Sequence, residues 1–581
     1  MSRIFHRMAA RTWRAVPVLI ALAVMTCLVP QAWGGPKDKV DAVLKDKILK
    51  GSTDTVRVII RIVPGKKDEL KSKLDKVLVK MGRDLPLING LTVELSVKAV
   101  DKLKDDLDVA GISVDGTVRG AADTTDPSYS LQGALGLTTS QTGQGIGVAV
   151  IDSGIEPSPE FDNRILAFYD FTAAAALTPS DGFGHGTHVA GLIAGSGSLS
   201  SGHYRGVAPG ANLLVYKVLD GTGAGRTSDV IAAITHAIAN KAALGIRVMN
   251  LSLGHPIYEK AATDPLVIAV EKASAAGIVV VTAAGNYGTN STTGKIGYAG
   301  IVSPGNAPSA ITVGASFTQG TITRSDDEVT TWSSRGPTWY DGYAKPDIVA
   351  PGRRMVSVGA KNSYLWNTYP AWQVEGNYLM LSGTSMATPV VAGSVALVLE
   401  ANKTAFPSAS PLTPNAVKAL VKYTAIKLTD PGTNALYNAL TQGTGSVNTA
   451  GAAQVAAAID PSVTVGNWWL KTAVSETTTV GTSTYTWAKD IVWGNNIVWG
   501  NSIYVNRTAW GLDIIWGNNI VWGNDIVWGN DIVWGNDIVW GNDIVWGNDI
   551  VWGNDIIWGN NIVWGNDIVW GNALVSANTT R

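Results

Sequence analysis

Short hydrophobic runs, each ending in glycine or a polar residue, recur through the middle of this 581-residue chain. The runs are GIGVAVIDSG (145–154), NLLVYKVLD (212–220), RVMNLSLG (247–254), GIVVVTAAGN (277–286) and AITVGAS (310–316). Continuous apolar runs of this length are typical of strands buried on both faces, and segments with helical periodicity, such as 227–245, separate them. The pattern predicts an α/β domain over 121–457, with a parallel sheet sandwiched by helices. Ligand sites in such folds lie at the carboxyl ends of the strands, where the polar residues fall here.

A different pattern occupies residues 35–120, which are rich in Lys and Asp. Three segments alternate or are β-branched, as strands are, and two carry apolar residues at helical spacing. The expected strands are 55–63, 91–96 and 109–118, and the expected helices are 65–82 and 98–106. This region is therefore predicted to be a small α+β unit of the ferredoxin-like kind, large enough to fold but marginal in core size.

The end of the chain repeats the hexapeptide WGNDIV over residues 487–572, after a Thr- and Ser-rich linker at 458–486 and before a short C-terminal end at 573–581. Ile, Val and Trp favour β-strands, and Gly, Asn and Asp favour turns. The repeat therefore predicts a β-rich tail, and a β-solenoid is one fold that suits it. From Lys489 onward nine aspartates face three basic residues, so the tail is acidic. Four roles stay open: a spacer or anchor at the cell surface, a polysaccharide-binding platform, a secretion or assembly signal, and a removable extension.

Residues 1–34 have the form of a signal peptide, with four leading arginines, an apolar stretch at 16–29 and small residues near the end. They predict a secreted or cell-surface protein, with an uncleaved membrane anchor as the alternative. The only cysteine, Cys27, lies inside this segment, so its removal leaves no disulfide. Charged residues make up 16% of the chain and the formal net charge is −1, which excludes a basic surface for nucleic acid.

Three glycine-flanked motifs each carry a residue type used in nucleophilic catalysis. Asp152 lies in VAVIDSGIEP, His185 in GHGTHVAGLIAG and Ser385 in LSGTSMATPVVAGSVALVLE. The spacing of His185 and His188 lacks the glutamate of a zinc-binding helix, and His188 is expected to be a packed or hydrogen-bonded residue. In this order the motifs resemble those of the subtilisin-like serine peptidases, and the match extends over 121–457.

The resemblance implies a role for each residue. Ser385 would be the nucleophile, His185 the base and then the acid, and Asp152 the group that orients the imidazole. Asn286 would donate to the oxyanion together with the backbone N–H of Ser385. Two segments resemble the family's substrate-binding edges, where an extended peptide pairs with backbone. Their residues are Gly221, Thr222, Gly223, Ser252, Leu253 and Gly254.

The resemblance also implies that the unit at 35–120 is an inhibitory propeptide, an intramolecular partner of the active site whose last residues are cut by Ser385; an ordinary small domain is the alternative. No cofactor is required for the chemistry. Structural calcium is implied by the family alone, with Asp162, Asp170 and Asp326 among the loop carboxylates that could contribute. The function expected is a secreted, self-processed serine endopeptidase acting on protein or peptide substrates. The alternative is a structural or adhesive surface protein whose peptidase domain serves mainly its own maturation.

Overall fold

The central element of the structure is a mostly parallel sheet with the strand order β15-β14-β12-β10-β6-β8-β7, in which β16 also pairs with β14. The computed structural model describes residues 39–74, 80–119, 131–137, 141–290, 293–493, 496–499, 504 and 506, and the tail strands between 521 and 570. Neighbouring strands are parallel except β15, which runs antiparallel to β14. The strands are β6 (Gly147–Asp152), β7 (Ile165–Asp170), β8 (Asn212–Lys217), β10 (Ile246–Leu251), β12 (Val279–Ala283), β14 (Ile311–Phe317), β15 (Glu328–Val329) and β16 (Ile348–Pro351). The predicted parallel sheet is confirmed, and all five predicted strands are present.

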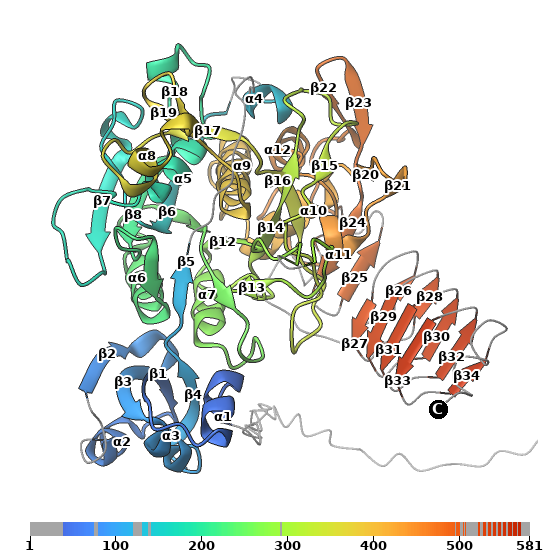
Figure 1. Ribbon diagram of the computed structural model, residues 1–581. Helices are drawn as coiled ribbons and strands as arrows, with labels where there is room; N and C mark the ends of the chain where they lie inside the picture. Colours follow the sequence, from blue (N-terminus) through green and yellow to red (C-terminus); the bar gives the residue numbers. More distant parts are fainter. Residues whose placement is uncertain are drawn as a thin grey trace, which may run out of the picture. The chain divides into compact units, whose positions relative to one another are not determined.

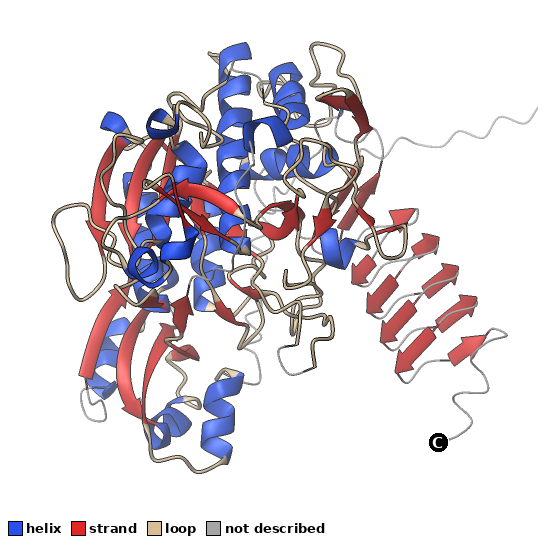
Figure 2. Ribbon diagram, turned by 45° about the horizontal axis from the view of Figure 1, so that its top comes forward, coloured by secondary structure: helices blue, strands red, loops and turns tan. Residues whose placement is uncertain are grey.

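Helices cover both faces of this sheet (Figures 1 and 2). Along β6, Val148 and Val150 belong to one apolar core and Ala149 and Ile151 to another, which explains why the strand has no polar face. The helices of the first core are α5 (His185–Ala194), α9 (Thr384–Ala405), α10 (Pro414–Tyr423) and α12 (Thr449–Ala458), and those of the second are α6 (Thr227–Asn240) and α7 (Pro265–Ala275). Among the described residues only α9 is long and apolar enough to cross a membrane, and 94% of that stretch is buried inside the protein.

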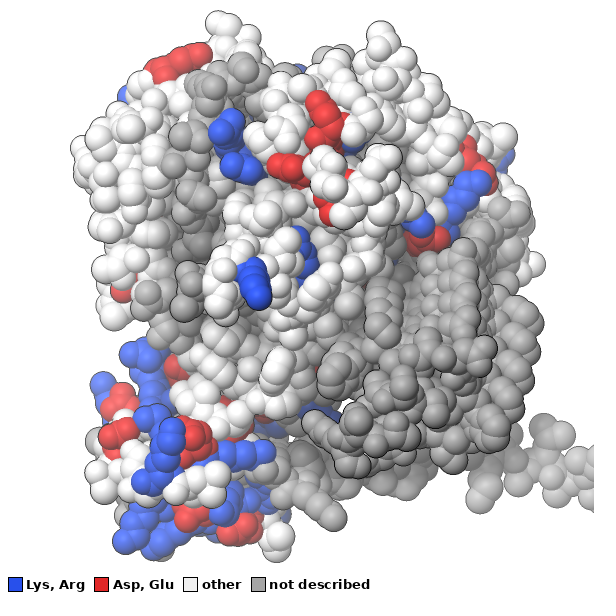
Figure 3. All heavy atoms as spheres, turned by 45° about the vertical axis from the view of Figure 1, so that its right-hand side comes forward, with Lys and Arg blue, Asp and Glu red and all other residues white. Residues whose placement is uncertain are grey.

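The N-terminal unit is a four-stranded antiparallel sheet with the order β2-β3-β1-β4. Its elements are α1 (Ala42–Leu49), β1 (Thr55–Ile62), α2 (Lys67–Leu74), β2 (Lys80–Leu85), β3 (Gly90–Ser96), α3 (Val97–Leu103) and β4 (Val109–Val114). The helix predicted over 65–82 is too long, because β2 begins inside it and pairs with β3 as an edge strand. Val58 and Ile60 face the unit's own core, whereas Ile59 joins the core of α6 and α7. Charged side chains gather on this unit far more densely than elsewhere in the view of Figure 3.

The segment predicted to be a linker, 458–486, is instead part of the folded domain. It contains a hairpin of β22 (Thr477–Val480) and β23 (Ser483–Thr486), and Trp469 and Trp487 are buried against the first core. Tyr504 belongs to the same core. Burial of these large aromatic side chains holds the segment on the core despite the Thr- and Ser-rich stretch within it. The folded domain therefore extends beyond residue 457.

The first two described strands of the tail, β24 (Asp490–Trp493) and β25 (Asn496–Trp499), pair antiparallel as a hairpin. From Val521 onward, described strands twelve residues apart pair in parallel, so that Trp540 lies opposite Trp552 and Gly541 opposite Gly553. The strands form two sheets, β26-β28-β30-β32-β34 and β27-β29-β31-β33, seen as rows of short arrows in Figure 2. They are β26 (Val521–Trp522), β27 (Val527–Gly529), β28 (Val533–Gly535), β29 (Ile538–Gly541), β30 (Ile544–Gly547), β31 (Ile550–Gly553), β32 (Ile556–Gly559), β33 (Ile562–Gly565) and β34 (Ile568–Trp570). The strands thus have a period of two hexapeptides. The signal segment predicted at 1–34 and the end at 573–581 lie outside the described residues.

The remaining described helices and strands are short. They are β5 (Thr117–Arg119), α4 (Leu131–Ala134), β9 (Ala224–Arg226), β11 (His255–Pro256), β13 (Val302–Ser303), β17 (Met355–Val358), α8 (Tyr364–Thr368), β18 (Gln373–Val374), β19 (Tyr378–Leu381), β20 (Thr429–Asp430), β21 (Ala435–Leu436) and α11 (Ala439–Gln442).

Candidate active site

Three predicted site residues lie at the carboxyl ends of adjacent strands. Asp152 is the last residue of β6, Ser252 follows β10 and Asn286 follows β12. Because β6, β10 and β12 are parallel neighbours, their ends meet at one edge of the sheet. That edge is where open parallel sheets place their ligand sites.

His185 begins α5 and faces Asp152, with 2.7 Å between His185 Nδ1 and Asp152 Oδ1. Both side chains are almost fully buried. The same carboxylate oxygen accepts a hydrogen bond from the backbone N–H of Ser153. Gly186 packs so closely on the backbone of Gly154 that a Cβ would lie 2.2 Å from its carbonyl oxygen. Glycine at this position therefore allows the helix start and the strand end to come within hydrogen-bonding distance.

Asp181, a residue that the sequence interpretation missed, holds the loop before α5 in place. One carboxylate oxygen accepts from Ser153 Oγ and the backbone N–H of Gly184, both at 2.7 Å, and the other accepts from the N–H and Oγ1 of Thr187. Asp181 is 3% exposed. The N-cap of α5 is Gly184, so Asp181 lies outside the position where a capping residue is sought, and the sequence carried no capping signal for it.

Ser385 is the second residue of α9 and is tied to the end of β10. Its Oγ donates to the carbonyl oxygen of Ser252 at 3.0 Å, and Ser252 Oγ donates to the carbonyl oxygen of Ser385 at 2.9 Å. His185 Nε2 is buried without a hydrogen-bond partner among the described residues. The nucleophile and base are thus each held by other groups, a looser arrangement that is common in structures without substrate.

Asn286 contacts the first turn of α9 through its amide oxygen. Asn286 Oδ1 accepts from the backbone N–H of Thr384 at 3.0 Å and from Thr384 Oγ1 at 3.1 Å, and this hydroxyl accepts from the N–H of Gly285. With its oxygen anchored there, the amide presents Nδ2 as a donor beside the N-terminus of the helix that carries Ser385. Donors at this place can stabilise a developing oxyanion.

The two histidines of α5 have opposite electrostatic environments. Burial alone would lower the pKa of His185, but the charge and hydrogen bond of Asp152, with the charge of Asp181, raise it above the ordinary 6.5. Burial and the charge of His185 lower the pKa of His188 to about 3. His188 Nε2 lies 3.0 and 2.9 Å from the carbonyl oxygens of Met355 and Leu379. His188 is therefore a packed, hydrogen-bonded residue, as predicted.

The two segments predicted to bind the substrate backbone differ in structure: one is a turn followed by a strand edge, and the other is largely buried. Gly221, Thr222 and Gly223 form a turn in which the N–H groups of Thr222 and Gly223 donate to Asp220, and the pairing edge begins one residue later, at β9. There β5 pairs antiparallel with β9, with Thr117 opposite Arg226 and Arg119 opposite Ala224.

On the other edge, Leu253 is 1% exposed, so its side chain is part of the core. Gly254 packs against Ser303, so that a Cβ would lie 2.7 Å from the Ser303 carbonyl oxygen.

The loop carboxylates that could contribute to a calcium site do not converge. Asp170 accepts from the N–H groups of Thr172 and Ala176, and Asp326 accepts from Thr321 Oγ1. Asp162 lies in a separate exposed turn. Across the part of the chain that the structure describes, no three His, Cys, Asp or Glu side chains are grouped to hold a metal ion. These residues do not fit a calcium ion.

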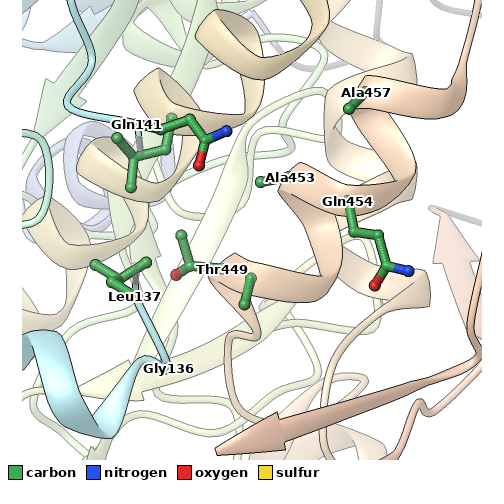
Figure 4. A pocket seen from close by; sticks show the side chains of 9 residues that line it. Gly136, Leu137, Gln141, Thr449, Ala453, Gln454 and Ala457 are labelled. Atoms are coloured by element: carbon green, nitrogen blue, oxygen red, sulfur yellow. The ribbon is translucent and has the colours of Figure 1, made fainter. Parts of the chain in front are cut away.

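A cavity of about 210 Å³ lies between α9 and α12, away from the catalytic groups (Figure 4). Its walls include Leu397, twelve residues after Ser385 on α9, which places the cavity about 18 Å along the helix from the serine. The other lining residues are Gly136, Leu137, Gln141, Thr449, Ala450, Ala453, Gln454 and Ala457. It is therefore separate from the candidate active site.

Comparison with known proteins agrees with this geometry. Residues 143–446 match the model of the subtilase family. The chain is 38% identical to serine protease AprX of Bacillus subtilis over 66% of this chain and 80% of that protein, and 36% identical to subtilisin E of the same species over 58% and 77%. Fervidolysin from Fervidobacterium pennivorans, described as a keratinolytic enzyme related to subtilisin, superposes with a TM-score of 0.54 at 25% identity, over 69% of this chain and 61% of that one. The chain belongs to the subtilase family and is a subtilisin-like serine endopeptidase.

Proposed function

We propose that this enzyme is an exported endopeptidase, made as a self-processed precursor, in which Asp152, His185 and Ser385 carry the chemistry. The observation that carries the proposal is the 2.7 Å contact of His185 with the buried Asp152, on the sheet edge where Ser385 begins α9. Serine hydroxyls are poor nucleophiles until a base removes the proton.

In the proposed reaction, Ser385 Oγ leaves its bond to Ser252 and attacks the scissile carbonyl as His185 Nε2 takes its proton. The C–N bond then breaks while the imidazolium returns the proton to the leaving amine, and a water repeats the sequence to free the acid. Asp152 holds Nδ1–H throughout and stabilises the imidazolium. The unpartnered Nε2 of His185 supports this role, because it is the one ring nitrogen available for proton transfer.

A fluorophosphonate probe tests the assignment directly. The probe should form a covalent adduct with the full chain, and peptide mapping by mass spectrometry should place it on Ser385. Hydrolysis of casein should fall in proportion to labelling. An adduct on another serine with retained casein hydrolysis would reject the assignment.

Removal of the Asn286 amide should slow the reaction without unfolding the protein. Asn286 is half-buried, so water can enter the space that Asn286→Ala leaves and bond to the buried N–H and hydroxyl of Thr384. We expect kcat to fall about 100- to 1000-fold with little change in KM, the scale known for the equivalent donor in subtilisin. Steady-state kinetics with a chromogenic peptide measures this. An equal rise in KM at unchanged kcat would instead assign Asn286 to substrate binding.

The pH dependence of activity should follow the protonation of His185. The base works only when neutral, and because its pKa is raised above 6.5, activity should already decline at a pH above that ordinary value as the pH falls. Well below that pKa, kcat/KM should fall about tenfold per pH unit. A profile of kcat/KM from pH 5 to 9 measures the midpoint. Constant activity between pH 5 and 8 would contradict the role of His185 as base.

The N-terminal unit, proposed to be the inhibitory propeptide at 35–120, is fastened to the peptidase at the start of α6. Asp115 accepts from the N–H of Ser228 at 2.8 Å and from its hydroxyl at 2.7 Å, and Arg57 completes the carboxylate's bonds. Thr227 donates to the carbonyl oxygen of Gly116. The strand that follows, β5, occupies the edge of β9. An extended segment lying on a proposed substrate edge supports the inhibitory role.

For the tail we propose a localising role, as an acidic β-solenoid spacer or polysaccharide platform, and not a catalytic one. The twelve-residue strand period and the nearly invariant hexapeptides support a solenoid. The subtilase family match and the similarity to known serine proteases support the enzymatic proposal over the adhesive alternative. Surface retention of tail-deleted protein separates the two.

Two truncations should differ sharply in their effect on the enzyme. Deleting 508–581 should change kcat/KM less than twofold, because the described contacts with the core end at Asn506. Deleting 481–581 removes buried Trp487 and Tyr504, which should lower the melting temperature by about 5 °C or more. Thermal unfolding and peptide hydrolysis of both proteins check this. If both truncations lower the melting temperature and the rate of hydrolysis equally, the repeats support the peptidase fold.

A further inference from the structure

An aromatic pair stands beside the catalytic histidine, and nothing in the proposed reaction uses it. The ring of Phe183 lies 6.3 Å from that of His185 and stacks on Tyr364 at 5.9 Å with an interplanar angle of 16°. Phe183 is 8% exposed, whereas Tyr364 is 50% exposed. The pair therefore consists of a buried inner ring, Phe183, and a half-exposed outer ring, Tyr364.

Tyr364 comes from a different part of the chain and is fastened to the histidine loop through backbone. It begins α8, and the N–H groups of Tyr364 and Leu365 donate to the carbonyl oxygens of Gly182 and Phe183 at 2.8 and 3.0 Å. Gly184 has φ of +97°, and a Cβ there would lie 2.3 Å from Ser363 Oγ. The backbone that carries the Tyr364 ring is thus fixed relative to the histidine loop.

The pair also borders the edge on which an extended chain lies. Because β5 runs antiparallel to β9, from Thr117 opposite Arg226 to Arg119 opposite Ala224, a chain on this edge heads toward Gly223. A Cβ on Gly223 would lie 2.4 Å from the Phe183 ring, so the ring packs directly on that backbone. The ring of Phe183 lies 6.3 Å from that of His185, so a side chain that contacts Phe183 belongs to a substrate residue close to the scissile bond but not directly at it.

We propose that Phe183 and Tyr364 form an aromatic wall that receives an aromatic or other large apolar side chain from the second substrate residue before the scissile bond. This inference rests on the proposed function, since it assumes that substrates lie on the β9 edge. The exposed ring of Tyr364 gains contact only when such a side chain covers it. A glycine at that substrate position leaves the ring in water.

A set of fluorogenic peptides that differ only in carrying Phe, Leu, Gly or Asp at each of the four positions before the scissile bond tests the proposal. The wild type should favour Phe over Gly about tenfold or more in kcat/KM at the second position, mainly through KM. Tyr364→Ala should reduce that preference to within about threefold, and Tyr364→Phe should retain it. The matched control is Trp468→Ala, because Trp468 is 56% exposed and packs on Tyr504 in a comparable way. It should leave the preference unchanged.

Three results would overturn the proposal. If Tyr364→Ala slows the Phe and Gly peptides equally, the ring has a structural role only. If the preference lies at another position, the pair does not border the second residue. If Tyr364→Phe loses the preference, the hydroxyl and not the ring surface is responsible. Failure of the proposed function looks different, since the wild type would then cleave none of the peptides.

Discussion

Ser385→Ala should abolish peptide hydrolysis and leave the precursor uncut. The substitution removes the nucleophile and one hydrogen bond, from Ser385 Oγ to the Ser252 carbonyl oxygen, and leaves the backbone of α9 unchanged. We expect kcat to fall roughly 10⁵- to 10⁶-fold, the scale known for the corresponding loss in subtilisin. If the chain processes itself, the variant should retain the unit at 35–120, which the wild type loses.

Intact mass and N-terminal sequence of both secreted proteins measure processing, and a chromogenic peptide measures hydrolysis. Ser408→Ala, an exposed serine, is the control and should behave as the wild type. If the wild type and Ser385→Ala are cut equally, another peptidase matures the precursor, and only the self-processing part fails. If Ser385→Ala keeps wild-type hydrolysis, the nucleophile has been assigned wrongly.

The sheet could be predicted because its central strands are buried on both faces. Val148 to Ile151 contribute alternately to two cores, so the strand appears in sequence as an unbroken apolar run. The edge strand β7 and the four-residue β16 were not predicted, since β7 is half-buried and β16 is too short to show a period. The first residues of the edge strand β2 were included in the helix predicted over 65–82, because the apolar residues up to Met81 follow helical spacing. Edge strands owe their existence to a partner far away in sequence, which local patterning does not show.

The site could be predicted as a set of residue types in motifs, but not as a set of contacts. Asp152 and His185 meet as the motifs imply. The bond from Ser385 to Ser252 joins residues 133 positions apart, and no local pattern encodes it. Tyr364 likewise reaches the histidine loop through backbone bonds that any residue could make. Contacts of this kind depend on how loops pack, which sequence spacing does not determine.

A second group of charges, remote from the chemistry described above, holds α10 against the sheet. Asp347, 1% exposed, lies 2.6 Å from Lys345, 2.8 Å from Lys422 and 3.0 Å from Lys418. Its Oδ2 also accepts from the N–H of Thr312 at 2.9 Å. Burial would raise the pKa of Asp347, but the three ammonium groups lower it well below its usual range. Asp347 is thus the direct ion-pair partner of three buried lysines, and the charge of Glu271 also acts on Lys418 and Lys345.

Asp347→Asn should therefore cause the largest loss of stability among single substitutions of charged residues here. It leaves three lysines facing one another without their counter-charge, and we expect the free energy of unfolding to fall by about 3–5 kcal/mol. Since the pKa of Asp347 is lowered, its contribution to stability is present above pH 3.8 and disappears as the pH falls further. The difference in unfolding free energy between the variant and the wild type should therefore narrow in acid.

Urea unfolding in the Ser385→Ala background measures the loss without self-digestion. Asp326→Asn, at an exposed carboxylate, should cost less than about 0.5 kcal/mol. Adding Lys418→Met to Asp347→Asn removes one of the uncompensated charges and should recover part of the loss. If it recovers nothing, the damage comes from the lost hydrogen bond to Thr312 and not from the buried charges.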